Sequence, residues 1–133
     1  MDLGEIKARL EAARRVEREV NGATFTLVMP TAHQWRVALQ DNRDELGRVL
    51  EAKAYRQVLS KALVSWRGLK ASDLVPEAPA DEVPFTPDAR ELLLDTRQDI
   101  ADELTIGVGA WLADQRTKRE EQLKNSAGAS NGN

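Results

Sequence analysis

The 133-residue sequence contains no cysteine and a single histidine. Without cysteine, the chain can form neither disulfides nor the thiolate sites that bind zinc or iron–sulfur clusters. His33 alone provides no set of metal ligands and no spacing typical of a catalytic base. Adjacent carboxylates such as Asp102 and Glu103 would point to different faces of a helix rather than form an acid/base pair. The sequence therefore favours a non-catalytic protein with no cofactor and no metal site.

Long apolar runs and an excess of basic charge are also missing. No stretch approaches the roughly 20 apolar residues of a membrane-spanning helix, and the first residues lack the basic and apolar regions of a secretory signal. The 19 Lys and Arg residues stand against 22 Asp and Glu residues, which gives a net charge of −3 and disfavours contact with a phosphate backbone. We expect a soluble, cytoplasmic protein that binds neither membrane nor nucleic acid.

Aromatic residues make up only 5% of the chain and charged residues 31%, a balance that favours helices over an aromatic-rich β-sandwich. The length allows one domain plus a tail. We predict an α+β, mostly α-helical fold in which residues 1–112 form a single helical domain. The polar residues 113–133 have little to bury, so we predict a flexible tail there that is disordered at its end.

An N-terminal β-hairpin is the strongest local prediction. Leu3, Ile6 and Leu10 first have the spacing of a short, solvated amphipathic helix. Apolar and charged residues then alternate, and Asn21-Gly22 supplies the two positive φ angles of a type I′ turn. The hairpin should span residues 15–29.

Capping signals predict about four to five helices after the hairpin. Thr31 and Gln34 have the spacing of a capping box. A long helix is predicted over residues 44–66, ended by Gly68 in the C′ position. An acidic, proline-containing loop over residues 73–84 follows.

Further along the chain, Thr86-Pro87 and Thr96 mark two more helix starts. Gly107 and Gly109 weaken the last of these helices, and we interpret them as a flexible or closely packed point rather than a phosphate-binding turn.

Charge and tryptophan each allow two interpretations. Residues 36–70 carry eight basic and four acidic side chains, whereas residues 73–103 carry two basic and ten acidic ones. These regions either face each other or are solvated, or the acidic one docks a basic partner. Trp35, Trp66 and Trp111 lie on three predicted helices as core anchors, or as binding hot spots if exposed.

The order of these pieces resembles the small tail assembly chaperones of long-tailed bacteriophages. The resemblance covers residues 16–125 and rests on two short motifs, Trp66-Arg67-Gly68-Leu69 and Val83-Pro84-Phe85-Thr86-Pro87-Asp88-Ala89, with the charged, Lys124-Asn125-bearing tail after them. The resemblance implies a non-catalytic protein of the host cytoplasm that is absent from the mature virion. Its implied partners are the tape measure protein, which it keeps soluble, and tail-tube subunits, which it recruits. Self-association remains open.

The family also implies a longer product made by programmed ribosomal frameshifting, and Lys124-Asn125 is compatible with an A-rich slippery stretch. Trp66, Leu69, Pro84 and Phe85 are the candidate site residues, interpreted first as structural, pinning the acidic loop onto the core, and second as partner contacts. One alternative is a tail-completion or connector subunit retained in the virion. Another is a host regulatory or enzyme-accessory domain.

Overall fold

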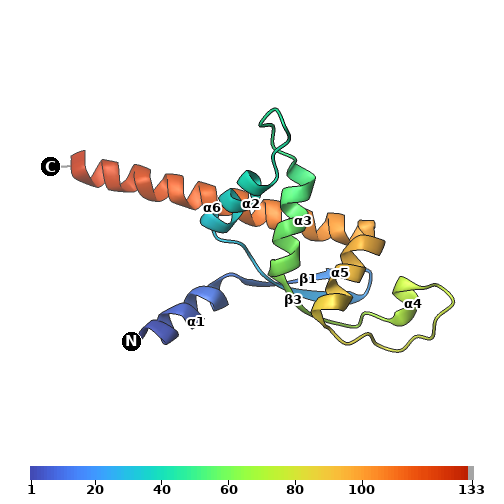
Figure 1. Cartoon of the computed structure of the whole chain (residues 1–133). Coiled ribbons are helices and arrows are strands. Elements are labelled where there is room, and N and C mark those ends of the chain that lie inside the picture. The colour runs from blue at the N-terminus through green and yellow to red at the C-terminus, as the bar shows by residue number, and fades with distance from the viewer. Residues whose placement is uncertain (132–133) are drawn as a thin grey trace.

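The computed structural model describes the backbone of residues 1–131 and the side chains of residues 1–127. The predicted class, α+β and mostly helical with an N-terminal hairpin, is confirmed, and five helices follow the hairpin within residues 1–131. The elements shown in Figure 1 are α1 (Leu3–Ala13), β1 (Arg15–Val20), β2 (Ala23–Val28), α2 (Ala32–Asp41), α3 (Glu51–Ala62), β3 (Leu63–Arg67), α4 (Ala71–Leu74), α5 (Pro87–Thr96) and α6 (Gln98–Asn131).

The hairpin forms as predicted. Asn21 and Gly22 have φ values of 51° and 84°, as a type I′ turn requires. Val20 pairs with Ala23 at the turn, and β3 then adds to the other side of β2 to give an antiparallel sheet of order β1-β2-β3. Alternate residues of β2, among them Phe25 and Leu27, are fully buried, so one face of the sheet carries the core.

Two predicted helix starts are confirmed in detail. Thr31 Oγ1 accepts a hydrogen bond from the backbone N–H of Gln34, whose side chain accepts from the N–H of Thr31, so the capping box of α2 is complete. Thr86 caps α5 by accepting from the N–H of Ala89, with Pro87 in the first turn. Local side-chain chemistry thus sets both helix starts.

The predicted long helix over residues 44–66 is wrong at both ends. Asp44 does not cap a helix, because its Oδ1 accepts from the N–H groups of Leu46 and Arg48 and folds residues 43–49 into a loop. The helix α3 begins at Glu51 and ends at Ala62, and the chain continues directly into β3. Trp66 therefore lies on a strand, and Gly68, with φ 79°, lies in the turn after it.

A β-bulge explains why the three-residue spacing of Leu63 and Trp66 predicted a helix where the structure has a strand. Phe25 pairs with Trp66 and Leu27 pairs with Leu63, with a register shift between them. The extra residue on β3 lets Leu63 and Trp66, three apart in sequence, both face the core, where they are 0% and 7% exposed. A spacing of three is normally typical of a helix, so the sequence alone favoured the wrong element.

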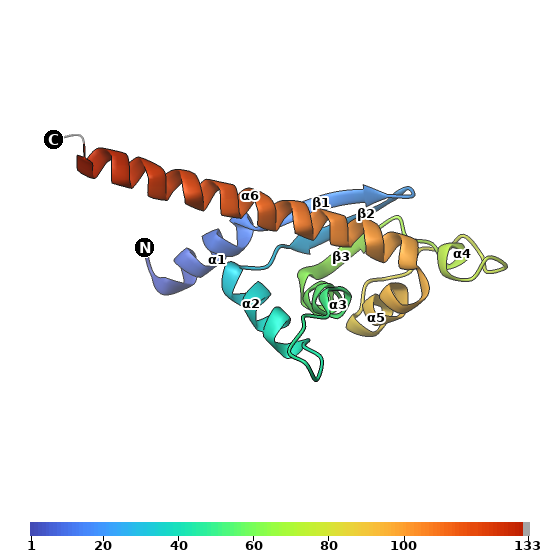
Figure 2. The same ribbon diagram turned by 90° about the horizontal axis from the view of Figure 1, so that it is seen from above.

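The helices α3, α5 and α6 pack against the same face of the sheet. Figures 1 and 2 show α6 crossing the hairpin with α3 and α5 beside it. Fully buried side chains from each layer meet there, namely Phe25, Leu27, Leu59, Leu63, Leu93, Ile100, Leu104 and Val108. Within residues 1–131, no helix covers the opposite face of the sheet.

The predicted flexible tail, residues 113–133, is helical as far as Asn131, where α6 ends. Residues 113–127 are polar and almost wholly exposed, as predicted, but Arg, Lys, Glu, Gln and Ala are strong helix formers. Asp114 and Lys118 add an i,i+4 ion pair of 3.1 Å. Figures 1 and 2 show this half of α6 projecting from the body. The last part of the predicted tail, residues 132–133, lies outside the described residues.

Candidate partner-binding surface

The two sequence motifs meet in the structure. Trp66 Nε1 donates a hydrogen bond of 2.7 Å to the carbonyl oxygen of Val83, and the Phe85 ring packs edge-on against the indole at 4.8 Å between centroids. Leu69 is 1% exposed, whereas Pro84 is exposed and Phe85 half-buried. The motifs hold the loop on the core, as their structural interpretation predicts. Partner contact stays a prediction, for which only Pro84 and part of Phe85 present surface.

Backbone contacts strengthen the same attachment. The N–H of Val83 donates to the carbonyl of Leu69 at 2.8 Å, and the N–H of Gly68 donates to Glu82 Oε1 at 3.1 Å. A Cβ at Gly68 would lie 3.1 Å from the carbonyl oxygen of Gly22, so a side chain there would press on the hairpin turn. The acidic loop, the end of β3 and the hairpin therefore form one packed unit.

The tryptophans differ in burial. Trp66 is a core anchor, as predicted. Trp35 and Trp111 pack against the core but are only partly buried. The Trp35 ring lies 4.6 Å from that of Tyr55, and Trp111 Nε1 donates to the carbonyl of Pro30 at 3.3 Å. Both therefore keep some indole surface available to a partner.

Gly107 and Gly109 are points of close packing. A Cβ at Gly107 would lie 3.1 Å from Cδ of Arg18, and one at Gly109 would lie 3.2 Å from Oη of Tyr55. α6 continues unbroken through both positions. Of the two predicted interpretations, the closely packed one is confirmed.

The basic and acidic regions do face each other at one place. Arg56 on α3 contacts Asp95 at 2.8 Å and Glu91 at 3.6 Å on α5. Within the acidic region, the hydrogen bond from Arg97 is the main reason that the pKa of the Asp99 carboxyl is lowered to about 2. Part of the negative charge is thus neutralised internally.

Helix α1 has no buried residue at all. Leu3, Ile6 and Leu10 are 77%, 41% and 62% exposed, and their spacing places them on one face of the helix. Figures 1 and 2 show α1 standing off the body. An isolated helix of 11 residues is marginal in water, so an apolar partner on this stripe would stabilise α1. The sequence showed the stripe but gave no sign that the fold leaves it uncovered.

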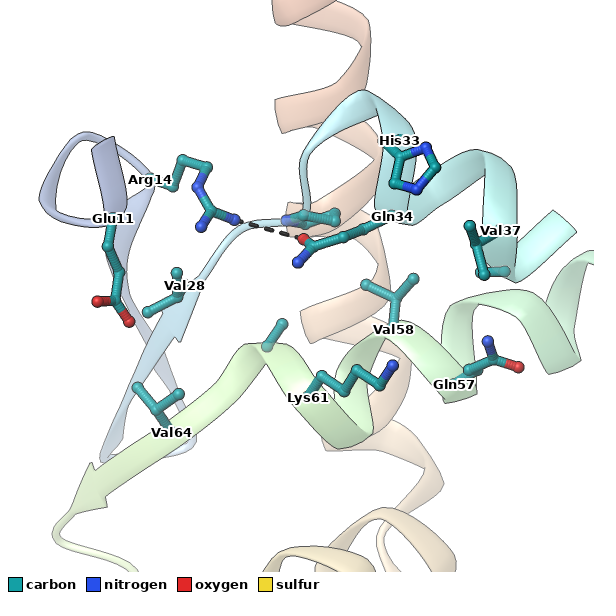
Figure 3. Close-up of a pocket in the computed structure, with 13 residues that line it drawn as sticks. Glu11, Arg14, Val28, His33, Gln34, Val37, Gln57, Val58, Lys61 and Val64 are labelled. Atoms are coloured by element: carbon teal, nitrogen blue, oxygen red, sulfur yellow. Dashed lines mark hydrogen bonds between the residues drawn. The ribbon is translucent and has the colours of Figure 1, made fainter. Parts of the chain in front are cut away.

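A groove opens beside the end of α1 (Figure 3). Its volume is about 380 Å³, and valine side chains from four elements line it, namely Val28, Val37, Val58 and Val64. Glu11, Arg14, His33 and Lys61 supply charged or titratable groups around these valines. Arg14 Nη1 donates to Gln34 Oε1 at 3.4 Å and to the carbonyl of Met29 at 2.7 Å. An apolar lining among charged groups of both signs suits one face of an amphipathic segment.

Among the described residues, no three His, Asp or Glu side chains lie close enough to hold a metal ion. None of the described helices combines the length and the apolar content needed to cross a bilayer. No family model matches this sequence, and neither a curated protein nor a solved structure shows significant similarity to it.

Proposed function

We propose that the protein is a tail assembly chaperone of a long-tailed phage that binds helical segments of the tape measure protein in the host cytoplasm. One observation carries the proposal: the exposed apolar stripe of α1 ends near the valine-lined groove, because Glu11, which follows Leu10 in α1, and Arg14, the C-cap of α1, both line that groove. Stripe and groove together form a surface for a partner helix with one apolar face.

The proposal gives a role to the exposed apolar side chains of α1. In a monomer, three large apolar side chains in water bring no stabilisation to a short helix, and burying each contributes about 1.5–3 kcal/mol. A partner helix laid along the stripe would supply that burial. The same contact would cover the apolar face of the tape measure helix, which is how a chaperone keeps such a protein soluble.

Tube recruitment and release before virion completion form the second part of the proposal. They rest on the resemblance of the two motifs, since no surface of the structure specifies a tube subunit. Mass spectrometry of purified virions tests this part. A chaperone is absent from them, whereas a stoichiometric amount in the particle would identify a tail-completion or connector subunit instead.

The binding surface can be tested with a matched pair of substitutions. Leu3 and Leu46 are both 77% exposed, but Leu46 lies in the loop between α2 and α3, away from the stripe. We expect Leu3→Glu to reduce co-purification of co-expressed tape measure protein and its soluble yield, and Leu46→Glu to leave both unchanged. Equal effects of the two substitutions would contradict the assignment of the surface.

A frameshifted second product is also part of the proposal. Lys124 lies on the exposed, projecting half of α6, so a different sequence after it would leave the core packing intact. An immunoblot for an N-terminal tag, with the protein expressed from its native DNA and the downstream frame intact, should show a major band near 14.8 kDa and a minor longer one. A single band would exclude the longer form.

A further inference from the structure

A second groove, on the other side of the start of α2, has a different character. Its volume is about 370 Å³. Four arginines from three parts of the chain line it together with two partly buried tryptophans: Arg14, Arg36, Arg116, Arg119, Trp35 and Trp111. No Asp or Glu is among the lining residues. We call it the arginine groove.

The arginine groove is not neutralised internally. Arg14 is held by the carbonyl of Met29 and by Gln34. Among the described residues, Arg36, Arg116 and Arg119 form no ion pair and no side-chain hydrogen bond. Asp114, on the same part of α6, pairs with Lys118 at 3.1 Å. Like charges gathered in one place repel, and an anionic partner would relieve that repulsion.

We infer that the arginine groove binds an acidic segment of a partner protein, one that carries carboxylates on either side of an apolar or aromatic side chain. Guanidinium groups bind carboxylates in a bidentate geometry, and Trp35 and Trp111 offer indole surface to the apolar side chain between them. The inference goes beyond the proposed function, because the arginine groove recognises negative charge and lies apart from the apolar stripe of α1, although Arg14 lines both grooves. It does not depend on which protein supplies the segment.

A polypeptide fits the groove better than a nucleic acid does. A phosphate backbone needs a continuous basic track, but the chain has a net charge of −3, and α6 carries Asp99, Asp102 and Glu103 on the side of the groove toward its N-terminus. A polyanion that left the groove along α6 in that direction would meet these carboxylates. A short acidic segment would end before it reached them.

The tryptophans provide the assay. In a ¹⁵N-labelled sample of the full chain, each indole N–H gives its own NMR signal, which Trp→Phe substitutions assign. A synthetic peptide with Asp and Glu around a Leu-Phe pair should shift the signals of Trp35 and Trp111 and leave that of the buried Trp66 in place. A peptide with Asn and Gln instead should bind at least about tenfold more weakly, because charge-assisted hydrogen bonds are lost.

Matched substitutions locate the site. Arg119→Glu and Arg36→Glu, on two different helices, should each weaken binding of the acidic peptide about tenfold. Lys124→Glu makes the same charge change on α6 outside the groove and should leave the affinity within about twofold. Circular dichroism of each variant checks that helical content is unchanged.

Three results would overturn the inference. The first is an absence of movement at Trp35 and Trp111 when the acidic peptide is added. The second is equal weakening by Lys124→Glu and Arg119→Glu, which would reduce the effect to net charge. The third is tighter binding of a single-stranded oligothymidylate than of the acidic peptide, which would assign the groove to nucleic acid.

Discussion

Gly107 and Gly109 lie two residues apart in α6, and alanine at each should change stability differently. Each substitution gains about 1 kcal/mol of helix propensity. At Gly107 the new Cβ would lie 3.1 Å from Cδ of Arg18, a flexible side chain whose ion pair with Glu103 is 3.3 Å long and partly exposed. Moving it costs at most about 1 kcal/mol, so we expect Gly107→Ala to be neutral or stabilising.

At Gly109 the neighbour cannot move as easily. The new Cβ would lie 3.2 Å from Oη of Tyr55, whose half-buried ring is packed against Trp35. Overpacking costs about 1–3 kcal/mol, which outweighs or cancels the gain in propensity. We expect Gly109→Ala to lower the free energy of unfolding by up to about 2 kcal/mol.

Chemical and thermal denaturation measure the difference in stability between Gly107→Ala and Gly109→Ala. The central expectation is a difference of about 1.5 kcal/mol between the two variants, or roughly 6 °C in Tm for a domain of this size. Removing Oη with Tyr55→Phe should turn Gly109→Ala into a stabilising change, and a double-mutant cycle gives that coupling directly. A Gly109→Ala protein as stable as Gly107→Ala, in the presence of Tyr55, would refute the reasoning.

Three further predictions follow from contacts described above. Trp66→Phe removes the hydrogen bond to Val83 and should lower the free energy of unfolding by about 1–3 kcal/mol; unchanged amide exchange at Val83 would show that the bond does not hold the loop. The hydrogen bond from Arg97 lowers the pKa of Asp99 from 3.8 to about 2 in the folded protein. The charged carboxylate therefore stabilises the fold fully above pH 3.8, and this stabilisation is lost as the pH falls from 3.8 through 2. The Tm difference between wild type and Asp99→Asn should therefore shrink from pH 4 to pH 2, and a constant difference would contradict the linkage. Gly22→Ala places a side chain at φ 84° and should destabilise the hairpin by about 1 kcal/mol, which hydrogen exchange of the turn amides measures.

The sequence predicted those elements whose signals are local. The hairpin follows from Asn21-Gly22, and the starts of α2 and α5 follow from Thr31 and Thr86, because turn and cap preferences act within a few residues. The strand β3 was missed because Leu63 and Trp66 have a helix-like spacing, and only pairing with β2 reveals the bulge that places them in a strand. Pairing of this kind is a long-range contact that a local pattern does not contain.

The candidate binding surfaces were predicted less completely. The apolar stripe of α1 is visible in the sequence, but its exposure depends on where the rest of the chain packs. The arginine groove gathers Arg14, Arg36 and Arg119 from positions far apart in sequence, so no spacing signal exists for it. Conversely, Trp66 and Leu69 stood out as a motif and are mostly occupied in holding the core together.

Because α6 is one unbroken helix, the packing of its first half in the core fixes the rotation of its second half about the helix axis. Leu104 and Val108 are clamped in the core, and Arg116 and Arg119 follow on the same uninterrupted helix. Each residue turns a helix by about 100°, so the packing of Leu104 and Val108, about two to four turns earlier, sets the direction in which the arginines point. Point substitutions in the helical segment between Val108 and Arg116 leave that direction unchanged. One residue inserted or deleted there would rotate the arginines out of the groove and leave the core intact. Variation among related chains should therefore preserve the length of this segment more strictly than its composition.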